Sequence, residues 1–328
     1  MQASTDWTEQ IAPDETERFQ RYANDFAAMQ KHKSQRFGNG RALHRKQLLA
    51  LRAHLDVLTD LPEAARHGLF AVPGRHEAWL RLSNGGTDRA ANATPDIRGF
   101  AIKVFGVDGP SALGTGPAAS QDFLLINHST FGFPNSDEFV GLVMAASKGG
   151  GSLLKYLFGR YGLFGAIGVI RGLKRALGKP FGGFAFEQFH TASPIACGPY
   201  AARVRLVPCG NPAAIAVKGE WAQDVKDRLA KAPLLFDFQL QFFVDEVSTP
   251  IENPSVEWEP SRAPFVTVAR LEIPQQDFAS EEAARFAEQV EAARFDPWSA
   301  LMAHRPLGDV MRARKVVYFA SGQTRATS

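Results

Sequence analysis

Three stretches in the second half of the chain alternate between apolar and polar residues: 200–207, 235–244 and 265–273. The middle stretch shows the pattern most clearly, with Phe236, Phe238, Leu240 and Phe242 on one side and Asp237, Gln239 and Gln241 on the other. Successive side chains of a β-strand point to opposite faces, so each stretch is predicted to be a strand with one buried face. Several long strands of this kind, mixed with helices, predict an α+β fold with an antiparallel barrel.

Helical periodicity predicts an N-terminal arm in residues 1–40. Within 14–31, apolar residues recur on one side of the predicted helix: Phe19, Tyr22, Phe26 and Met29. Such a face is expected to pack on the body of the same chain or on a neighbour. The remaining residues, 41–328, are expected to form one domain. Further helices are predicted at 222–231 and 280–294, the second with Ser280 as its N-cap.

Composition excludes some classes of function. With 45% hydrophobic and 22% charged residues, the chain is typical of a globular protein. The net charge of +3 is too small to indicate a nucleic-acid partner, and the sequence has no zinc-finger cysteine spacing. Two cysteines, Cys197 and Cys209, fit a reducing compartment better than a disulfide scaffold. Because the N-terminus does not resemble a signal sequence, we expect a cytoplasmic location.

Residues 148–179 form a basic and apolar segment without any acidic residue. Its cations are Lys148, Lys155, Arg160, Arg171, Lys174, Arg175 and Lys179. The apolar run inside it, 161–170, is too short to span a bilayer. One interpretation is a basic amphipathic helix that makes peripheral contact with an anionic membrane or lines an entry route for an acidic amphiphile. The other is a helical excursion that covers the barrel, although the glycines in this segment disfavour a helix.

Near its end the chain places an arginine and a tyrosine four residues apart. The stretch 310–320 has the pattern of a helix, so Arg314 and Tyr318 should share one face of it. A fixed guanidinium next to a phenol favours the ionised form of the phenol. A phenolate is a hard anionic ligand that suits ferric iron.

This motif resembles the proximal haem helix of the haem catalases, in which a tyrosine binds the iron. Arg314 and Tyr318 are followed by Arg325, seven residues beyond the tyrosine, as in that family. The stretch 295–308 also resembles small catalase-related proteins. The resemblance implies that 306–325 is the proximal haem helix, that Tyr318 ligates the iron of haem b (ferric protoporphyrin IX), and that Arg314 supports the phenolate.

Two upstream motifs resemble the distal side of the same family. Arg41 and His44 match its Arg-x-x-His motif, and Arg81 and Ser83 match an Arg-Phe-Ser strand in the alternating stretch 77–83. By this resemblance His44 would take a proton from bound peroxide and return it to the leaving oxygen, while Ser83 fixes the orientation of its ring. The resemblance also implies three arginines that bind the haem propionates: Arg41, Arg81 and Arg325.

Two further segments extend the resemblance, one of them with a departure. The stretch 96–105 is similar to the family's Asp-Pro-Arg-Gly-Phe-Ala signature, and 121–128 is similar to the segment that leads to a distal asparagine. In the direct alignment Ile126 takes the place of that asparagine, whereas a shift of one residue would restore Asn127 to it. Phe131 corresponds to the distal phenylalanine. Because the asparagine positions the second peroxide in dismutation, its loss would affect catalase activity more than haem binding.

The resemblance implies an eight-stranded antiparallel barrel surrounded by helices, with haem between the barrel and the proximal helix. The sequence ends soon after Arg325, so we expect it to lack the C-terminal helices of full-size catalases and to have a more open pocket. A homo-oligomer is also expected from the family.

The expected function is a haem-dependent peroxidase that reduces hydrogen peroxide or organic hydroperoxides with a small organic electron donor, and that has weak catalase activity. Two alternatives stay open. One is an isomerase or dehydratase of fatty-acid hydroperoxides, similar to the catalase-like allene oxide synthases. The other is a non-enzymatic haem carrier or sensor, which the presence of both His44 and Ser83 disfavours.

Overall fold

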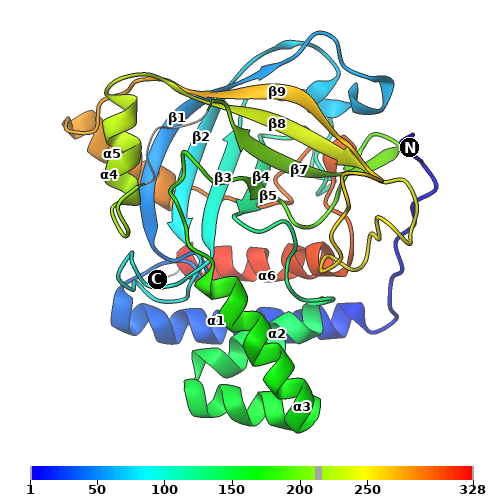
Figure 1. The fold of residues 1–328 in the computed structure, drawn as a ribbon, viewed down its shortest axis with the longest axis vertical. Helices are drawn as coiled ribbons and strands as arrows, with labels where there is room; N and C mark the ends of the chain where they lie inside the picture. Colours follow the sequence, from blue (N-terminus) through cyan, green and yellow to red (C-terminus); the bar gives the residue numbers. More distant parts are fainter. Residues whose placement is uncertain (1, 211–215, 327–328) are drawn as a thin grey trace.

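The computed structural model describes residues 2–210 and 216–326, and its centre is an antiparallel β-barrel (Figure 1). The strands are β1 Gln47–Val57, β2 Gly74–Asn84, β3 Arg98–Val104, β4 Gln121–Ile126, β5 Phe189–His190, β6 Ile195–Cys197, β7 Tyr200–Pro208, β8 Leu234–Phe242 and β9 Phe265–Ile273. They are hydrogen-bonded in the order β5-β4-β3-β2-β1-β9-β8-β7-β6. Because β5 also pairs with β7, eight strands close into a barrel and β6 extends the edge of β7. The predicted antiparallel barrel is therefore confirmed.

The barrel interior is filled by the apolar side of the alternating strands. Phe236, Phe238 and Leu240 of β8 are fully buried, whereas Asp237 and Gln239 on the other face keep partial exposure. Alternate residues of β2, β3 and β4 join them in one apolar core: Leu80, Leu82, Phe100, Ile102, Phe123 and Leu125. Since the interior is packed with side chains, any ligand on this part of the molecule must bind outside the barrel or at its ends.

The described residues contain six α-helices: α1 Glu15–Phe37, α2 Ser136–Ser147, α3 Gly150–Gly178, α4 Trp221–Leu229, α5 Glu281–Ala292 and α6 Asp309–Ala326. The predicted N-cap of α5 is confirmed, because the Ser280 hydroxyl accepts a hydrogen bond of 3.2 Å from the Ala283 amide. Short 3₁₀ turns occur at Glu63–Ala65, Gly68–Phe70 and Met302–His304.

Helices α1 and α6 run side by side beneath the barrel (Figure 1). The predicted apolar face of α1 is buried against α6 and α2 in one cluster, which contains Phe19, Tyr22, Phe26, Met29, Val140, Ala313 and Val317. The arm thus packs on its own chain. Its burial fixes α6, which carries Arg314 and Tyr318, beneath the barrel.

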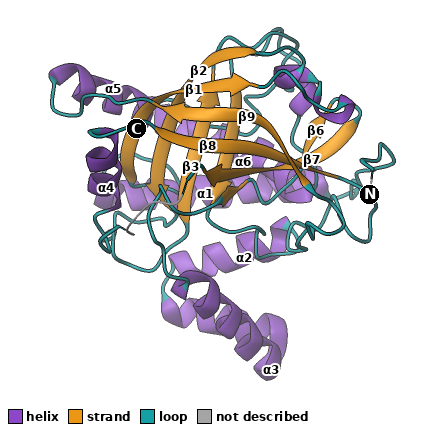
Figure 2. Cartoon of the chain, turned by 45° about the horizontal axis from the view of Figure 1, so that its top comes forward, coloured by secondary structure: helices purple, strands orange, loops and turns teal. Residues whose placement is uncertain are grey.

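Helices α2 and α3 extend away from the barrel, below α1 (Figures 1 and 2). Helix α3 covers most of the segment with many glycines, so those glycines do not prevent a helix from forming. They do allow a break, because Gly162 has φ of 65° and ψ of −176° inside α3. The segment therefore consists of two helical pieces joined at Gly162.

Candidate active site

The predicted distal histidine is held in a strained loop between α1 and β1. His44 has φ of 50°, in the left-handed region that non-glycine residues rarely adopt. Two backbone contacts hold it there: the Arg81 guanidinium donates to the His44 carbonyl at 2.9 Å, and the His44 amide donates to the Gly85 carbonyl at 3.0 Å. A conformation of this kind persists only where its surroundings determine it, which is common at functional sites.

The imidazole of His44 lies on the outer face of the barrel beside two strands. Its Nδ1 is 3.0 Å from the Ser83 hydroxyl oxygen, as the resemblance implied. Ser83 pairs with Gly99 across β2 and β3. A Cβ atom on Gly99 would lie 2.5 Å from His44 Nδ1 and 2.6 Å from Ser83 Oγ. Gly99 is therefore needed because the imidazole packs directly on the backbone of β3.

The surroundings keep the His44 ring neutral. Burial lowers its pKa to about 3, and the positive charges of Arg81, Arg314 and Arg41 contribute to this lowering. The residue is nevertheless partly exposed at the protein surface. At neutral pH it is thus a free base that can accept a proton.

The proximal pair forms as the four-residue spacing predicted. The Arg314 guanidinium donates a hydrogen bond of 2.8 Å to the Tyr318 hydroxyl, within α6. The same two side chains are linked electrostatically to the distal residues, because Arg314 lowers the pKa of His44 and Tyr318 raises that of Arg41. The structure thus brings Arg314 and His44, from opposite ends of the chain, close enough to interact electrostatically.

The three arginines predicted to bind propionates meet at the end of α5. One oxygen of the Glu291 carboxylate is 3.1 Å from Arg41 and the other is 2.9 Å from Arg81. Arg325 is 3.4 Å from the Glu291 carbonyl oxygen. The sequence analysis did not identify Glu291. Helix α5 contains several glutamates, and their spacing does not distinguish the one that faces the arginines.

The charge of this group is unbalanced. Two guanidinium groups contact the Glu291 carboxylate and the third lies at the Glu291 carbonyl oxygen, so these three arginines exceed the one carboxylate by two positive charges. Burial and the neighbouring Arg81 together lower the pKa of Arg41 well below its usual range. Its buried Nη1 atom lies 3.1 Å from the Glu291 carboxylate, in an orientation that does not form a hydrogen bond. Because arginine stays protonated in proteins, such a group requires additional negative charge, and a ligand with two carboxylates would supply it.

The register of β4 decides between Ile126 and Asn127. Ile126 pairs with Gly99, which pairs with Ser83, so Ile126 shares the outer face with the distal serine. Asn127 points the other way and is buried, and its side-chain oxygen accepts a hydrogen bond of 2.8 Å from the Arg98 amide. The register therefore places Ile126, and not Asn127, on the face that carries Ser83.

Phe131 packs against the aromatic rings of Phe133 and Phe139. Its ring is 4.7 Å from the ring of Phe139, at the start of α2. Phe139 in turn packs on the cluster that contains Leu43 and Val317, the neighbours of His44 and Tyr318 in the sequence. Within the described residues, no ring contact joins Phe131 directly to His44 or Tyr318.

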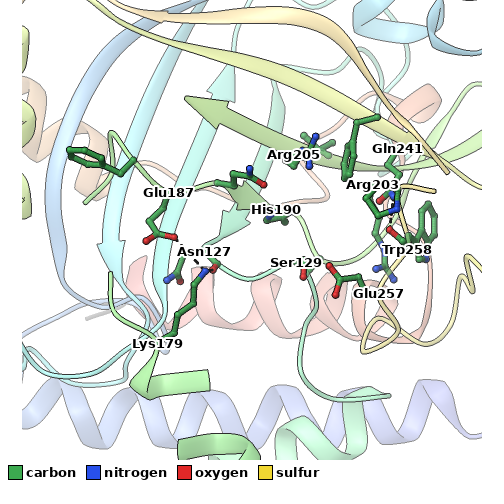
Figure 3. A pocket seen from close by; sticks show the side chains of 16 residues that line it. Asn127, Ser129, Lys179, Glu187, His190, Arg203, Arg205, Gln241, Glu257 and Trp258 are labelled. Atoms are coloured by element: carbon green, nitrogen blue, oxygen red, sulfur yellow. Dashed lines mark hydrogen bonds and ion pairs between the residues drawn. The ribbon is translucent and has the colours of Figure 1, made fainter. Parts of the chain in front are cut away.

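A separate cavity of about 450 Å³ lies beside β5 and β7 (Figure 3). It is polar, with Lys179 between the Asn127 carbonyl and the Glu187 carboxylate, each at 3.4 Å. Arg203 borders it with Nε and Nη2 buried without hydrogen-bond partners, and burial lowers its pKa to about 9. Apart from Asn127, the alternative for the distal asparagine, none of the residues predicted for the haem site lines this cavity.

No family model matches the chain, and no curated protein matches it. Solved structures, however, do match the chain. The chain superimposes on a fungal catalase with a TM-score of 0.66 and 16% identity, over 90% of this chain and 61% of the catalase. For catalase A from Saccharomyces cerevisiae the TM-score is 0.69 and the identity 14%, over 90% of this chain and 63% of the catalase. For a bacterial catalase the TM-score is 0.64 and the identity 12%, over 99% of this chain and 63% of the catalase.

This likeness shows that the chain has the catalase fold, as the sequence motifs implied. The chain spans about three fifths of the length of these catalases.

Proposed function

We propose that the protein is a haem-dependent peroxidase that reduces hydrogen peroxide or organic hydroperoxides with a small organic donor, and that its catalase activity is weak. One observation carries this proposal. A neutral histidine next to a serine interacts electrostatically with an arginine that is hydrogen-bonded to a tyrosine, on a catalase fold. A haem carrier needs no such oriented base.

The residues of the site fit haem b. Tyr318 would bind the iron, and the guanidinium groups of Arg41, Arg81 and Arg325 would bind the two propionates. The excess of two positive charges equals the charge of two carboxylates. When bound, haem supplies the iron that carries the redox chemistry of peroxide reduction.

The protein's own contribution is proton transfer. In the tautomer whose Nδ1 donates to Ser83 Oγ, Nε2 is free to take the proton from one peroxide oxygen and deliver it to the other. Arg81 holds the His44 backbone, and Gly99 allows the ring to approach the sheet. In the complete reaction, two electrons and two protons from the donor convert the peroxide to water, or a hydroperoxide to an alcohol and water.

Ile126 is the reason to expect peroxidase activity above dismutation. Dismutation requires a second peroxide to be positioned in the site, and an alkyl side chain offers it no hydrogen bond. The outer face of β4 presents Leu124 and Ile126, both partly exposed. A flat apolar donor could contact this surface, whereas hydrogen peroxide gains nothing from it.

Oxygen release from hydrogen peroxide, followed with an oxygen electrode on the haem-loaded protein with and without an oxidisable phenol, tests the proposal. We expect little oxygen and rapid oxidation of the phenol. Ile126→Asn should raise oxygen release relative to phenol oxidation, with the holo spectrum as the check on folding. Rapid oxygen release that phenol does not suppress would contradict the proposal. A rearranged product from a fatty-acid hydroperoxide would instead indicate an isomerase or dehydratase.

A further inference from the structure

We propose that helix α3 docks this protein on an anionic lipid surface. The helix projects from the body of the molecule beyond α1 and α2 (Figure 2). It exposes large apolar side chains and unpaired cations together, which is unusual for a helix that only covers a barrel. This inference does not depend on haem or on peroxidase activity.

The apolar part of the surface, which we call the α3 tip, consists of Leu154, Phe158, Leu163 and Phe164. Their exposed fractions are 48%, 41%, 60% and 86%. Leu154 and Phe158 are four residues apart, so they lie on one side of the first helical piece. Leu163 and Phe164 follow directly after the break at Gly162. The most exposed aromatic ring is thus at the point where the two helical pieces meet.

The cations of the second piece form one group. Arg171, Lys174 and Arg175 are exposed, and their spacing of three and four residues places them on one face of the helix. Among the described residues, no ion pair involves any of the three or Lys155. By contrast, Arg160 is paired with Asp137 and Lys179 with Glu187. A surface of unpaired cations next to exposed apolar groups complements anionic lipid headgroups above an acyl region.

The inner side of α3 is anchored, so the surface is presented by a defined structure. Leu157 and Ala166, one from each helical piece, are fully buried against Leu142 of α2. The Tyr161 hydroxyl donates to the Glu138 carboxylate. Because Leu157 and Ala166 are buried whereas the side chains of the α3 tip are exposed, the tip is free while α3 stays packed.

The break at Gly162 indicates contact with a membrane surface and not a crossing. By length and composition alone, α3 could span a bilayer, and only 11% of its most apolar window is buried. The non-helical Gly162 divides it into residues 150–161 and 163–178. At about 1.5 Å per residue, the longer piece reaches roughly 24 Å, short of a hydrocarbon core of about 30 Å. A broken backbone exposed to lipid would also leave amides without partners.

Co-sedimentation of the full chain with phosphatidylcholine vesicles, with and without phosphatidylserine, tests this inference. We expect binding only with phosphatidylserine. Arg171→Gln, Lys174→Gln and Arg175→Gln combined should weaken it on the order of 100-fold, since each cation near an anionic surface contributes about fivefold. Leu163→Ser with Phe164→Ser should weaken it by at least about tenfold.

Control variants remove an equal charge, or an exposed apolar side chain, elsewhere on the surface. They are Lys31→Gln, Arg66→Gln and Lys231→Gln combined, and Val247→Ser; these residues are exposed and lie outside α3. The controls should bind vesicles as the wild type does. The wild type should also bind equally with and without haem, which separates this inference from the proposed function.

Three results would overturn it: equal binding to vesicles of phosphatidylcholine alone, equal losses in the controls, or self-association that Leu163→Ser with Phe164→Ser abolishes in the absence of any vesicle binding. The last result would mean that a second copy covers the α3 tip.

Discussion

At the residue scale, the site depends on pairs of side chains that determine each other's state. Ser83 orients His44, Arg314 holds the Tyr318 hydroxyl, and Gly99 makes room where a methyl group would clash with both His44 and Ser83. The first pair would prepare a residue for proton transfer, and the second would prepare one for iron binding.

Tyr318→Phe should weaken haem binding and change the iron spectrum, because the proximal oxygen is lost. Arg314→Gln should lower haem affinity by about tenfold, which is typical for a residue that supports a ligand from behind. Haem titration followed by absorption spectroscopy measures both. Tyr200→Phe, a change to a partly buried tyrosine of β7, is the control and should bind haem normally. An unchanged holo spectrum for Tyr318→Phe would exclude Tyr318 as the iron ligand.

At the element scale, the end of α5 determines the charge of the site. The Glu291 carboxylate forms ion pairs with Arg41, from the loop before β1, and with Arg81 of β2. Its carbonyl oxygen lies near Arg325 of α6. One glutamate thus holds side chains from three separate elements, and its carboxylate keeps the excess charge of the arginines at two.

Glu291→Gln should lower the free energy of unfolding of the haem-free protein by about 1–3 kcal/mol, because partly buried guanidinium groups lose their counter-ion. Haem should then stabilise this variant more than the wild type, since two propionates would meet three uncompensated cations. Chemical denaturation with and without haem measures both effects. Glu288→Gln, one turn earlier and exposed, is the matched control. The charge-balance interpretation would be wrong if haem stabilised both variants equally.

At the scale of the whole molecule, buried histidines make the fold sensitive to acid. Burial lowers the pKa of His304 to about 4, and its Nε2 accepts a hydrogen bond of 3.0 Å from the Leu69 amide. Since the folded pKa lies below the unfolded value of about 6.5, the unfolded state takes up the proton first. The contribution of this residue is therefore present above pH 6.5 and is lost as the pH falls toward 4.

From pH 7 to pH 5 this loss should amount to about 2 kcal/mol of unfolding free energy. Asp122, whose pKa burial raises to about 6, acts in the opposite direction. The measurement is therefore the difference in pH slope between the wild type and His304→Gln, obtained by denaturant titration at several pH values. The slope should flatten in this variant and stay unchanged in His32→Gln, a change to an exposed histidine of α1. Equal slopes in all three proteins would contradict the assignment.

Local spacing by itself determined several features of this protein. Strand periodicity predicted which residues of β8 enter the core, and helical periodicity placed Arg314 beside Tyr318 on α6. The Ser280 cap was also predictable. These features depend on residues only a few positions apart, so the geometry of one helix or strand is sufficient to predict them.

Other features were decided only by the tertiary structure, because they depend on residues far apart in the chain. The pairing of β5 with β7 closes the barrel, and the pairing of β3 with β4 directs Ile126 toward the site and Asn127 away from it. Glu291 is distinguished from the other glutamates of α5 only when the elements carrying Arg41 and Arg81 pack around it. The sequence also left open whether residues 148–179 cover the barrel or project from it. They project, because α3 packs on α2 and not on the barrel.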